Sequence, residues 1–179
     1  MQNYALHYDY NENKYDLIIL FKNKTFNSVE KFDIVDVFYA DDEVVTYVIH
    51  GINNFMKIYS KGVIHSPLKE MIDVINSILK KAKLSALPYK ENSGFIIGRI
   101  ISENQIDLGD ITIETICPKD LIDAYVVIAT PNTFISRDKY VSDYHLCSYN
   151  DLNISESDEV FVIDEQCSPG KDFYLWEAK

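Results

Sequence analysis

The stretch SPLKEMIDVINSILKKAKL, residues 66–84, decides the predicted fold because it is the one segment with a clear helical repeat. Its apolar side chains recur every three or four residues and fall on one face, while lysine, acidic and amide side chains fall on the other. Ser66 is suited to capping a helix, Pro67 to its first turn, and the lysines near residue 80 to the negative pole of the helix dipole. We therefore predict one long amphipathic helix over 66–84 that packs against a sheet.

Short runs of β-branched and aromatic residues on both sides of this helix predict strands. Before the helix, tight turns separate runs such as 14–21 and 44–49, which indicates an antiparallel meander. After it, residues 95–101 and 125–129 are strong strand candidates, and 173–176 is predicted to be a final strand. About nine or ten short strands with one long helix define an α+β fold class with a mostly antiparallel sheet.

The chain has 179 residues, the length of one domain, and its 47% hydrophobic content suffices for a sizeable core. Its charge is divided unevenly. Residues 1–100 hold 12 acidic and 12 basic side chains, whereas 101–179 hold 16 acidic and 5 basic ones, so the second part carries the whole net charge of −11. We predict a single domain over 1–179, with 86–94 as the place of any subdivision, because the charge balance changes there.

Composition excludes several classes of function. No run is apolar and long enough for a membrane span, and the start has no signal-peptide pattern, so we expect a cytoplasmic protein that binds no membrane. The widely spaced Cys117, Cys147 and Cys167 match neither a disulfide framework nor a zinc site. The acidic second part would repel phosphates, which argues against nucleic acid. Without a phosphate-binding loop or nucleophile elbow, we predict no cofactor, no metal and no enzymatic activity.

One pair of residues nevertheless has the types that nucleophilic catalysis uses. His145 and Cys147 are two positions apart, so on a strand they would share a face, and Asp143 could orient the histidine from the same face. We favour a partly exposed histidine beside a packed cysteine. Adjacent carboxylates such as Asp158 and Glu159 lie in turn-like places, where solvation is the simpler interpretation and cation binding or acid–base catalysis the alternative.

The stretch 140–165 is the most suggestive part of the acidic half, because it alternates tyrosines with carboxylates and contains no lysine or arginine. Tyrosine supplies rigid contact area at interfaces, and carboxylates around it would steer a lysine- or arginine-rich surface. A solvated acidic surface with packed tyrosines is the competing interpretation. The predicted partner-binding residues are Tyr140, Asp143, Tyr144, Tyr149, Asp151, Glu156, Asp158, Glu159, Asp164 and Glu165.

Small size, acidity, aromatic content and the lack of catalytic motifs together resemble the immunity proteins that neutralise bacterial toxins, nuclease toxins in particular. The resemblance is one of type, spans the whole chain and rests on no specific motif. It implies a basic protein partner, such as a cognate toxin domain whose cationic site is covered. Two alternatives stay open: a hydrolase whose carboxylates are brought together by the fold, and a structural or assembly subunit. The oligomeric state is left open.

Overall fold

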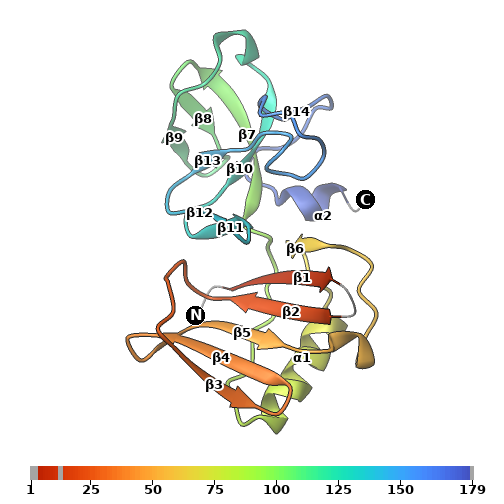
Figure 1. Cartoon of the computed structure of the whole chain (residues 1–179). Helices are drawn as coiled ribbons and strands as arrows, with labels where there is room; N and C mark the ends of the chain where they lie inside the picture. Colours follow the sequence, from red (N-terminus) through yellow and green to blue (C-terminus); the bar gives the residue numbers. More distant parts are fainter. Residues whose placement is uncertain (1–3, 12–13, 178–179) are drawn as a thin grey trace. The chain divides into compact units, whose positions relative to one another are not determined.

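A computed structural model describes residues 4–11 and 14–177 of the chain (Figure 1). The chain divides into two compact units, of which the first ends at Glu91 and the second begins at Asn92. This boundary falls within the segment 86–94, where the charge balance of the sequence changes. Each unit has its own sheet and its own apolar core. The division does not test the prediction of one folding domain, which stays a prediction.

The first unit is built on a six-stranded antiparallel sheet with the strand order β3-β4-β5-β2-β1-β6. Its strands are β1 (Ala5–Asn11), β2 (Lys14–Leu20), β3 (Ser28–Phe32), β4 (Val35–Ala40), β5 (Glu43–Ile49) and β6 (Gly62–Ile64). A 3-10 turn, η1 (Ile52–Asn54), follows β5. Residues alternate along β4 and β5, so that Val35, Val37 and Ile49 face the core while Asp36 and Val48 lie on the other face.

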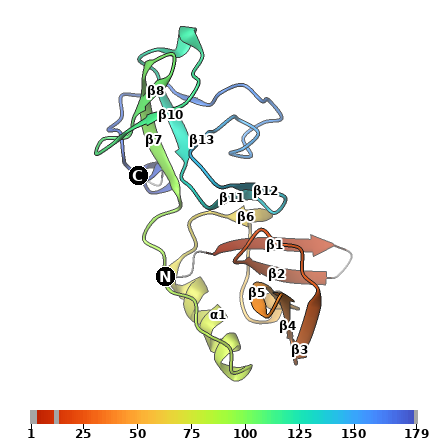
Figure 2. The same cartoon turned by 90° about the vertical axis from the view of Figure 1, so that its left-hand side faces the viewer.

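The inner face of this sheet is covered by helix α1 (Lys69–Lys81), as Figure 2 shows. The helix buries Ile72, Ile75, Ile78 and Leu79 in the same cluster as the inward side chains of the sheet. Ser66 does not cap it, because Leu68 takes the cap position in an extended conformation without a side-chain hydrogen bond. At the other end Lys83 adopts the left-handed conformation (φ 57°), and the Leu84 N–H closes the helix onto the Leu79 carbonyl at 2.9 Å.

The predicted α+β class with a long helix over 66–84 is wrong. The described chain is mostly sheet, with 14 strands in three sheets, and α1, at 13 residues, is its one helix of seven residues or more. The strand count was too low because five strands between 105 and 146 contain two to four residues each, too few for alternation to be recognised. No helix in the described ranges is long and apolar enough to cross a membrane.

The second unit contains an antiparallel sheet with the order β13-β10-β7-β8-β9, in which β14 also pairs with β10, and a separate hairpin of β11 and β12. Its strands are β7 (Phe95–Ser102), β8 (Gln105–Asp107), β9 (Thr112–Glu114), β10 (Tyr125–Ala129), β11 (Thr133–Ser136), β12 (Lys139–Val141), β13 (His145–Leu146) and β14 (Val162–Ile163), with the 3-10 turn η2 (Lys119–Leu121) before β10. Apolar clusters lie on both faces: Phe95 and Val127 belong to one, Ile100 and Ile128 to the other.

The segment 173–176 is helical rather than extended, and it belongs to α2 (Phe173–Glu177). Asp172 explains this difference. Its Oδ1 atom accepts the backbone N–H groups of Tyr174 and Leu175 at 3.1 and 3.2 Å, the arrangement of a helix N-cap. The same carboxylate accepts the Ser93 hydroxyl at 3.0 Å. The aromatic composition of the segment favours a strand, but the cap fixes the first turn of a helix.

Candidate functional site

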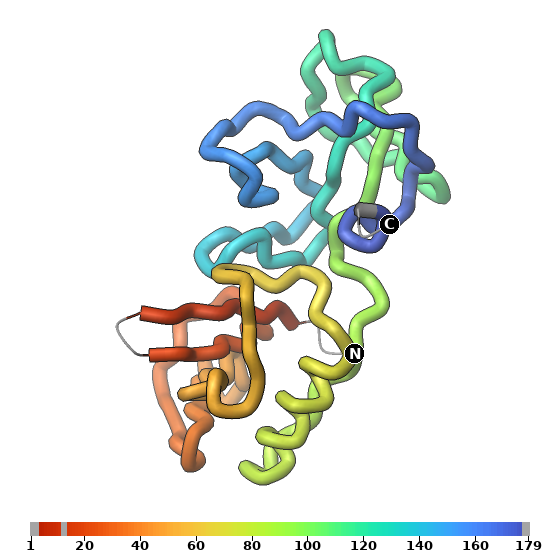
Figure 3. Tube along the Cα trace, turned by 90° about the vertical axis from the view of Figure 1, so that its right-hand side faces the viewer, coloured from red at the N-terminus to blue at the C-terminus, as the bar shows by residue number. Residues whose placement is uncertain are grey.

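The loop that carries half of the predicted partner-binding residues interrupts one edge of the second sheet. β13 and β14 both pair with β10, along the edge that β7 leaves free, so they form one edge strand with a long insertion. We call residues 148–160, which form this insertion, the acid loop. In Figure 3, where colour follows the residue number, it lies in the blue part of the tube. Insertions of this kind, with their ends close together, form compact Ω-type loops.

The two ends of the acid loop are tied together. The Phe161 N–H donates to the Cys147 carbonyl at 3.0 Å, and the Tyr149 N–H donates to the Glu159 carbonyl at 3.1 Å. The rings of Tyr149 and Phe161 meet edge to face, with centroids 5.0 Å apart. Leu152 is buried in the apolar cluster of the unit. These contacts hold the backbone at the base of the acid loop in place.

Asp151 anchors the base of the acid loop from inside the unit, where its side chain is 5% exposed. Its Oδ2 atom accepts from His145 Nε2 at 2.8 Å and from the Ser148 N–H at 3.0 Å, and its Oδ1 atom pairs with the Lys139 ammonium. Burial alone would raise the pKa of this carboxyl, but the donors outweigh it and hold the pKa well below its usual range. Asp151 therefore organises the loop instead of presenting its charge to solvent.

Three other carboxylates of the acid loop, those of Glu156, Asp158 and Glu159, are exposed. Asp158 accepts a hydrogen bond from Asn150 Nδ2 at 3.1 Å. Among the described residues none of the three forms an ion pair, and Lys139 is paired with Asp151. The loop thus presents three negative charges on an ordered backbone with no cation of the described chain to neutralise them.

The remaining predicted residues lie outside the acid loop. Asp143 is exposed before β13, and Asp164 and Glu165 are exposed after β14, so they flank the two halves of the interrupted edge strand. The predicted tyrosines Tyr140, Tyr144 and Tyr149 are half-buried and already used in packing. Tyr140, for example, packs edge to face on Phe134 at 4.9 Å and donates to Asn132 Oδ1 at 2.6 Å. The exposed polar surface of the stretch is therefore dominated by its carboxylates.

His145 and Cys147 do not form an activated nucleophile. The Cys147 thiol is buried, which raises its pKa to about 12, and it faces the backbone carbonyl of His145 at 3.7 Å. The His145 ring contacts Asp151, while Asp143 accepts the backbone N–H of Tyr144 at 2.7 Å. All three cysteines of the chain are free thiols, and Cys147 and Cys117 are buried.

Sequence reasoning missed the roles of Lys139 and Ser148. The Asp151 N–H donates to Ser148 Oγ at 3.1 Å while the Ser148 N–H donates to the Asp151 carboxylate, a reciprocal pair of the kind found in capping boxes. The spacing Ser148-x-x-Asp151 is a readable signal for this pair. Lys139 has no such signal, because it lies on β12, 12 residues before Asp151, and β13 comes between them. Across the described ranges, no group of three His, Cys, Asp or Glu side chains could hold a metal ion.

Comparison with known proteins adds no assignment: no protein-family model matches the chain, and no curated protein matches its sequence. The resemblance to immunity proteins therefore stays a prediction. What the geometry itself provides is a loop with a packed base and exposed charges of one sign.

Proposed function

We propose that this chain is a binding protein that neutralises a basic protein, and that the acid loop is the part that meets the partner. One observation carries the proposal. The loop is closed and packed at its base, yet Glu156, Asp158 and Glu159 stand exposed without an ion pair among the described residues. An acidic loop that served only to keep the chain soluble would not need a base held in place by these contacts.

The physical chemistry of this surface favours fast and selective association. Residues 92–179 hold 16 acidic and 6 basic side chains, so the second unit attracts a cationic surface from a distance. A backbone held in place at its base lowers the entropy lost on binding, since fewer conformations are given up. Ile154, which is 50% exposed and lies two residues before Glu156, offers apolar contact area for such an interface.

Within the class of binding proteins we propose an immunity function, in which the partner is a bacterial toxin domain. A nuclease toxin is the best chemical match, because its substrate site binds phosphates and is cationic. Three carboxylates on an ordered loop would occupy such a site and exclude the nucleic acid by charge and by volume. The resemblance in size, acidity and aromatic content supports the same class.

The test is neutralisation of a basic toxin encoded by the neighbouring gene. Cells that produce the toxin should survive when they also produce this chain. The double substitution Glu156→Lys with Glu159→Lys should abolish survival, because it reverses two exposed charges whose carboxylates make no hydrogen bond in the described structure. The matched control is Asp110→Lys with Glu114→Lys, which makes the same charge change next to and on β9.

The two variants separate the possible outcomes. Survival with the control but not with the loop variant supports the acid loop as the interface. Equal loss in both variants would show that net charge alone matters, and survival with both would exclude the acid loop. A basic neighbouring toxin that this chain neither binds nor neutralises would contradict the immunity function.

A further inference from the structure

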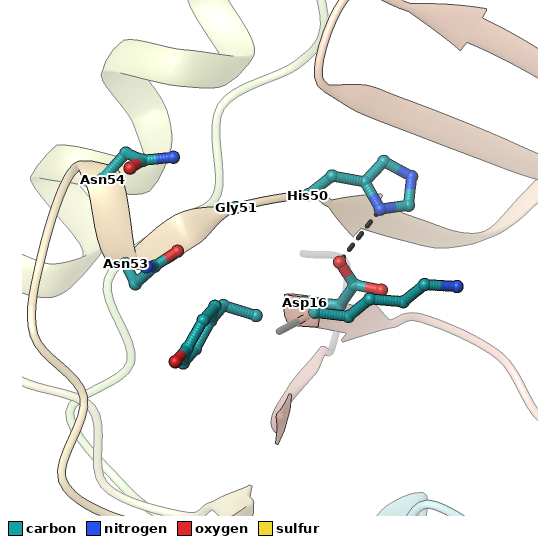
Figure 4. Close-up of a pocket in the computed structure, with 7 residues that line it drawn as sticks. Asp16, His50, Gly51, Asn53 and Asn54 are labelled. Carbon is teal, nitrogen blue, oxygen red and sulfur yellow. Dashed lines mark hydrogen bonds and ion pairs between the residues drawn. The ribbon is translucent and has the colours of Figure 1, made fainter. Parts of the chain in front are cut away.

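A histidine in the first unit bridges two aspartates from different strands. The Nδ1 atom of His50 lies 2.9 Å from Asp16 Oδ1 on β2, and its Nε2 atom lies 3.1 Å from Asp36 Oδ2 on β4. Figure 4 shows the first of these contacts, beside the turn that carries Asn53 and Asn54. His50 directly follows β5, which lies between β4 and β2 in the sheet. One imidazole ring therefore connects three adjacent strands at their ends.

Both contacts at once require a doubly protonated ring. An ionised carboxylate can only accept hydrogen bonds, and a neutral imidazole has a single N–H to donate. A neutral His50 could therefore satisfy either Asp16 or Asp36, but its second nitrogen would present a lone pair to the other carboxylate. Only the imidazolium donates on both sides, so the geometry is that of a positively charged His50.

The charged groups around His50 form a row across the outer face of the sheet. On β3, Lys31 lies 4.0 Å from Asp36 Oδ2, and on β1, Asp9 is directly opposite Asp16 in the β-sheet register. Lys14 of β2 lines the same open pocket as Asp16 and His50. Among the described residues, His50 is the one group that bridges Asp16 and Asp36. Its charge separates two carboxylates that would otherwise repel each other across the end of β5.

His50 also fixes the turn that follows it. Its backbone N–H donates to the Ile34 carbonyl at 2.8 Å, and Gly51 then takes the left-handed conformation (φ 64°) that starts η1. The Asn54 N–H returns to the Gly51 carbonyl at 3.0 Å. Residues 51, 53 and 54 line the pocket, whose volume is about 400 Å³. The backbone of His50 thus starts the turn, and His50 also lines the pocket beside these turn residues.

We propose that protonated His50 is a clamp that ties β2 and β4 to the end of β5, and that loss of its ring proton releases the turn 51–55. This device lies in the first unit and does not depend on the function proposed for the acid loop. Partial burial lowers the pKa of His50, but the hydrogen bonds and charges of Asp16 and Asp36 together raise it above the ordinary value. The clamp is therefore closed below pH 6.5 and opens as the pH rises through the raised folded-state pKa.

The test is a titration of the full chain followed by NMR of the ring nitrogens. We expect both nitrogens of His50 to be protonated at pH 6 and its titration midpoint to lie above the ordinary 6.5. The substitutions Asp16→Asn and Asp36→Asn should each move the midpoint down. A His50 ring with one nitrogen-bound proton at pH 6, or a titration midpoint at or below 6.5, would overturn the proposal. Both are measured on the unmodified chain, so the test does not depend on whether a variant folds.

Amide hydrogen exchange tests the release of the turn. Exchange of the Asn54 and Phe55 amides should speed up more between pH 6 and pH 8 than exchange of the Leu84 amide at the end of α1. Taking the ratio to Leu84 removes the base catalysis that all amides share. If the ratio of the Asn54 and Phe55 exchange rates to the Leu84 rate does not change between pH 6 and pH 8, the His50 ring proton does not hold the turn. The variant His50→Gln should exchange at a ratio that is independent of pH.

Discussion

The Nε2 atom of His145 lies 2.8 Å from Oδ2 of Asp151, and this contact joins β13 to the base of the acid loop. The same carboxylate also accepts the Ser148 N–H and pairs with Lys139 of β12, so one buried side chain connects two strands and the loop. The exposed carboxylates of the loop depend on this base for their fixed positions.

Replacing Asp151 by asparagine should destabilise the chain. The substitution keeps the size of the side chain but removes the charge that faces Lys139 and His145, so the free energy of unfolding should fall by about 2 kcal/mol. Urea unfolding at pH 7 measures this loss. The exposed Asp164→Asn is the matched control and should change the free energy by less than about 0.5 kcal/mol. Equal effects of the two substitutions would show that Asp151 does not anchor the loop.

The contribution of Asp151 should also depend on pH. Its folded-state pKa is lowered, so the stability it provides is complete above the ordinary aspartate pKa of about 3.9 and is lost as the pH falls towards the folded-state value. The difference in free energy of unfolding between the unmodified chain and Asp151→Asn should therefore shrink between pH 7 and pH 3. A difference that stays constant over this range would contradict the lowered pKa.

Thiol labelling separates the cysteines. Burial raises the pKa of Cys147 to about 12, so in the folded chain at pH 8 it should react with iodoacetamide about 100-fold or more slowly than an unhindered thiol. Cys167, which is only half-buried, should react first. Mass spectrometry of the labelled peptides identifies the sites, and all three should react alike in denaturant. Rapid labelling of Cys147 in the folded chain would support the rejected Cys–His pair.

Gly98 tests the packing of the second sheet. A Cβ atom at this position would lie 2.6 Å from Ile106 Cγ2 and 3.0 Å from Leu108 Cδ2. Both side chains belong to the apolar cluster that contains Ile128. Because the φ angle of Gly98 is ordinary, Gly98→Ala should act through overpacking and lower the free energy of unfolding by about 1–3 kcal/mol. Thr112→Ala on the exposed side of β9 is the control. An unchanged free energy for Gly98→Ala would mean that the cluster is loosely packed.

The sequence predicts part of this structure, and the reason for each success or failure is local. Apolar residues alternate along the long strand β5 and recur at helical spacing in α1, so the sequence predicts both elements. The helix is shorter than its apolar stripe because Leu68 is extended and Lys83 is left-handed, which periodicity does not register. The helical α2 depends on the Asp172 cap, whose signal is weaker than the strand preference of the aromatic residues after it.

For the candidate site, the sequence indicates a stretch of the chain but not the contacts within it. Charge asymmetry and the missing lysines indicated the stretch 140–165, and its exposed acids are a property of composition. That Asp151 is buried follows from partners distant in sequence, such as Lys139, and no local pattern contains them all. His50 bridges Asp16 and Asp36, and the three residues come from three different strands or their ends. Only the pairing of the strands in the sheet places them side by side, so the sequence alone does not predict the bridge.

Recognition of a basic protein by the acid loop should depend on salt, because the exposed carboxylates would steer association through long-range charge. The association rate constant of the purified basic partner should be measured by stopped-flow at rising sodium chloride concentrations. It should fall steeply for the unmodified chain and for Asp110→Lys with Glu114→Lys. The salt dependence should be much weaker for Glu156→Lys with Glu159→Lys, because two of the steering charges are reversed. An association rate that does not depend on salt, or one that the loop substitutions leave unchanged, would show that the acid loop is not the surface that recognises the basic partner.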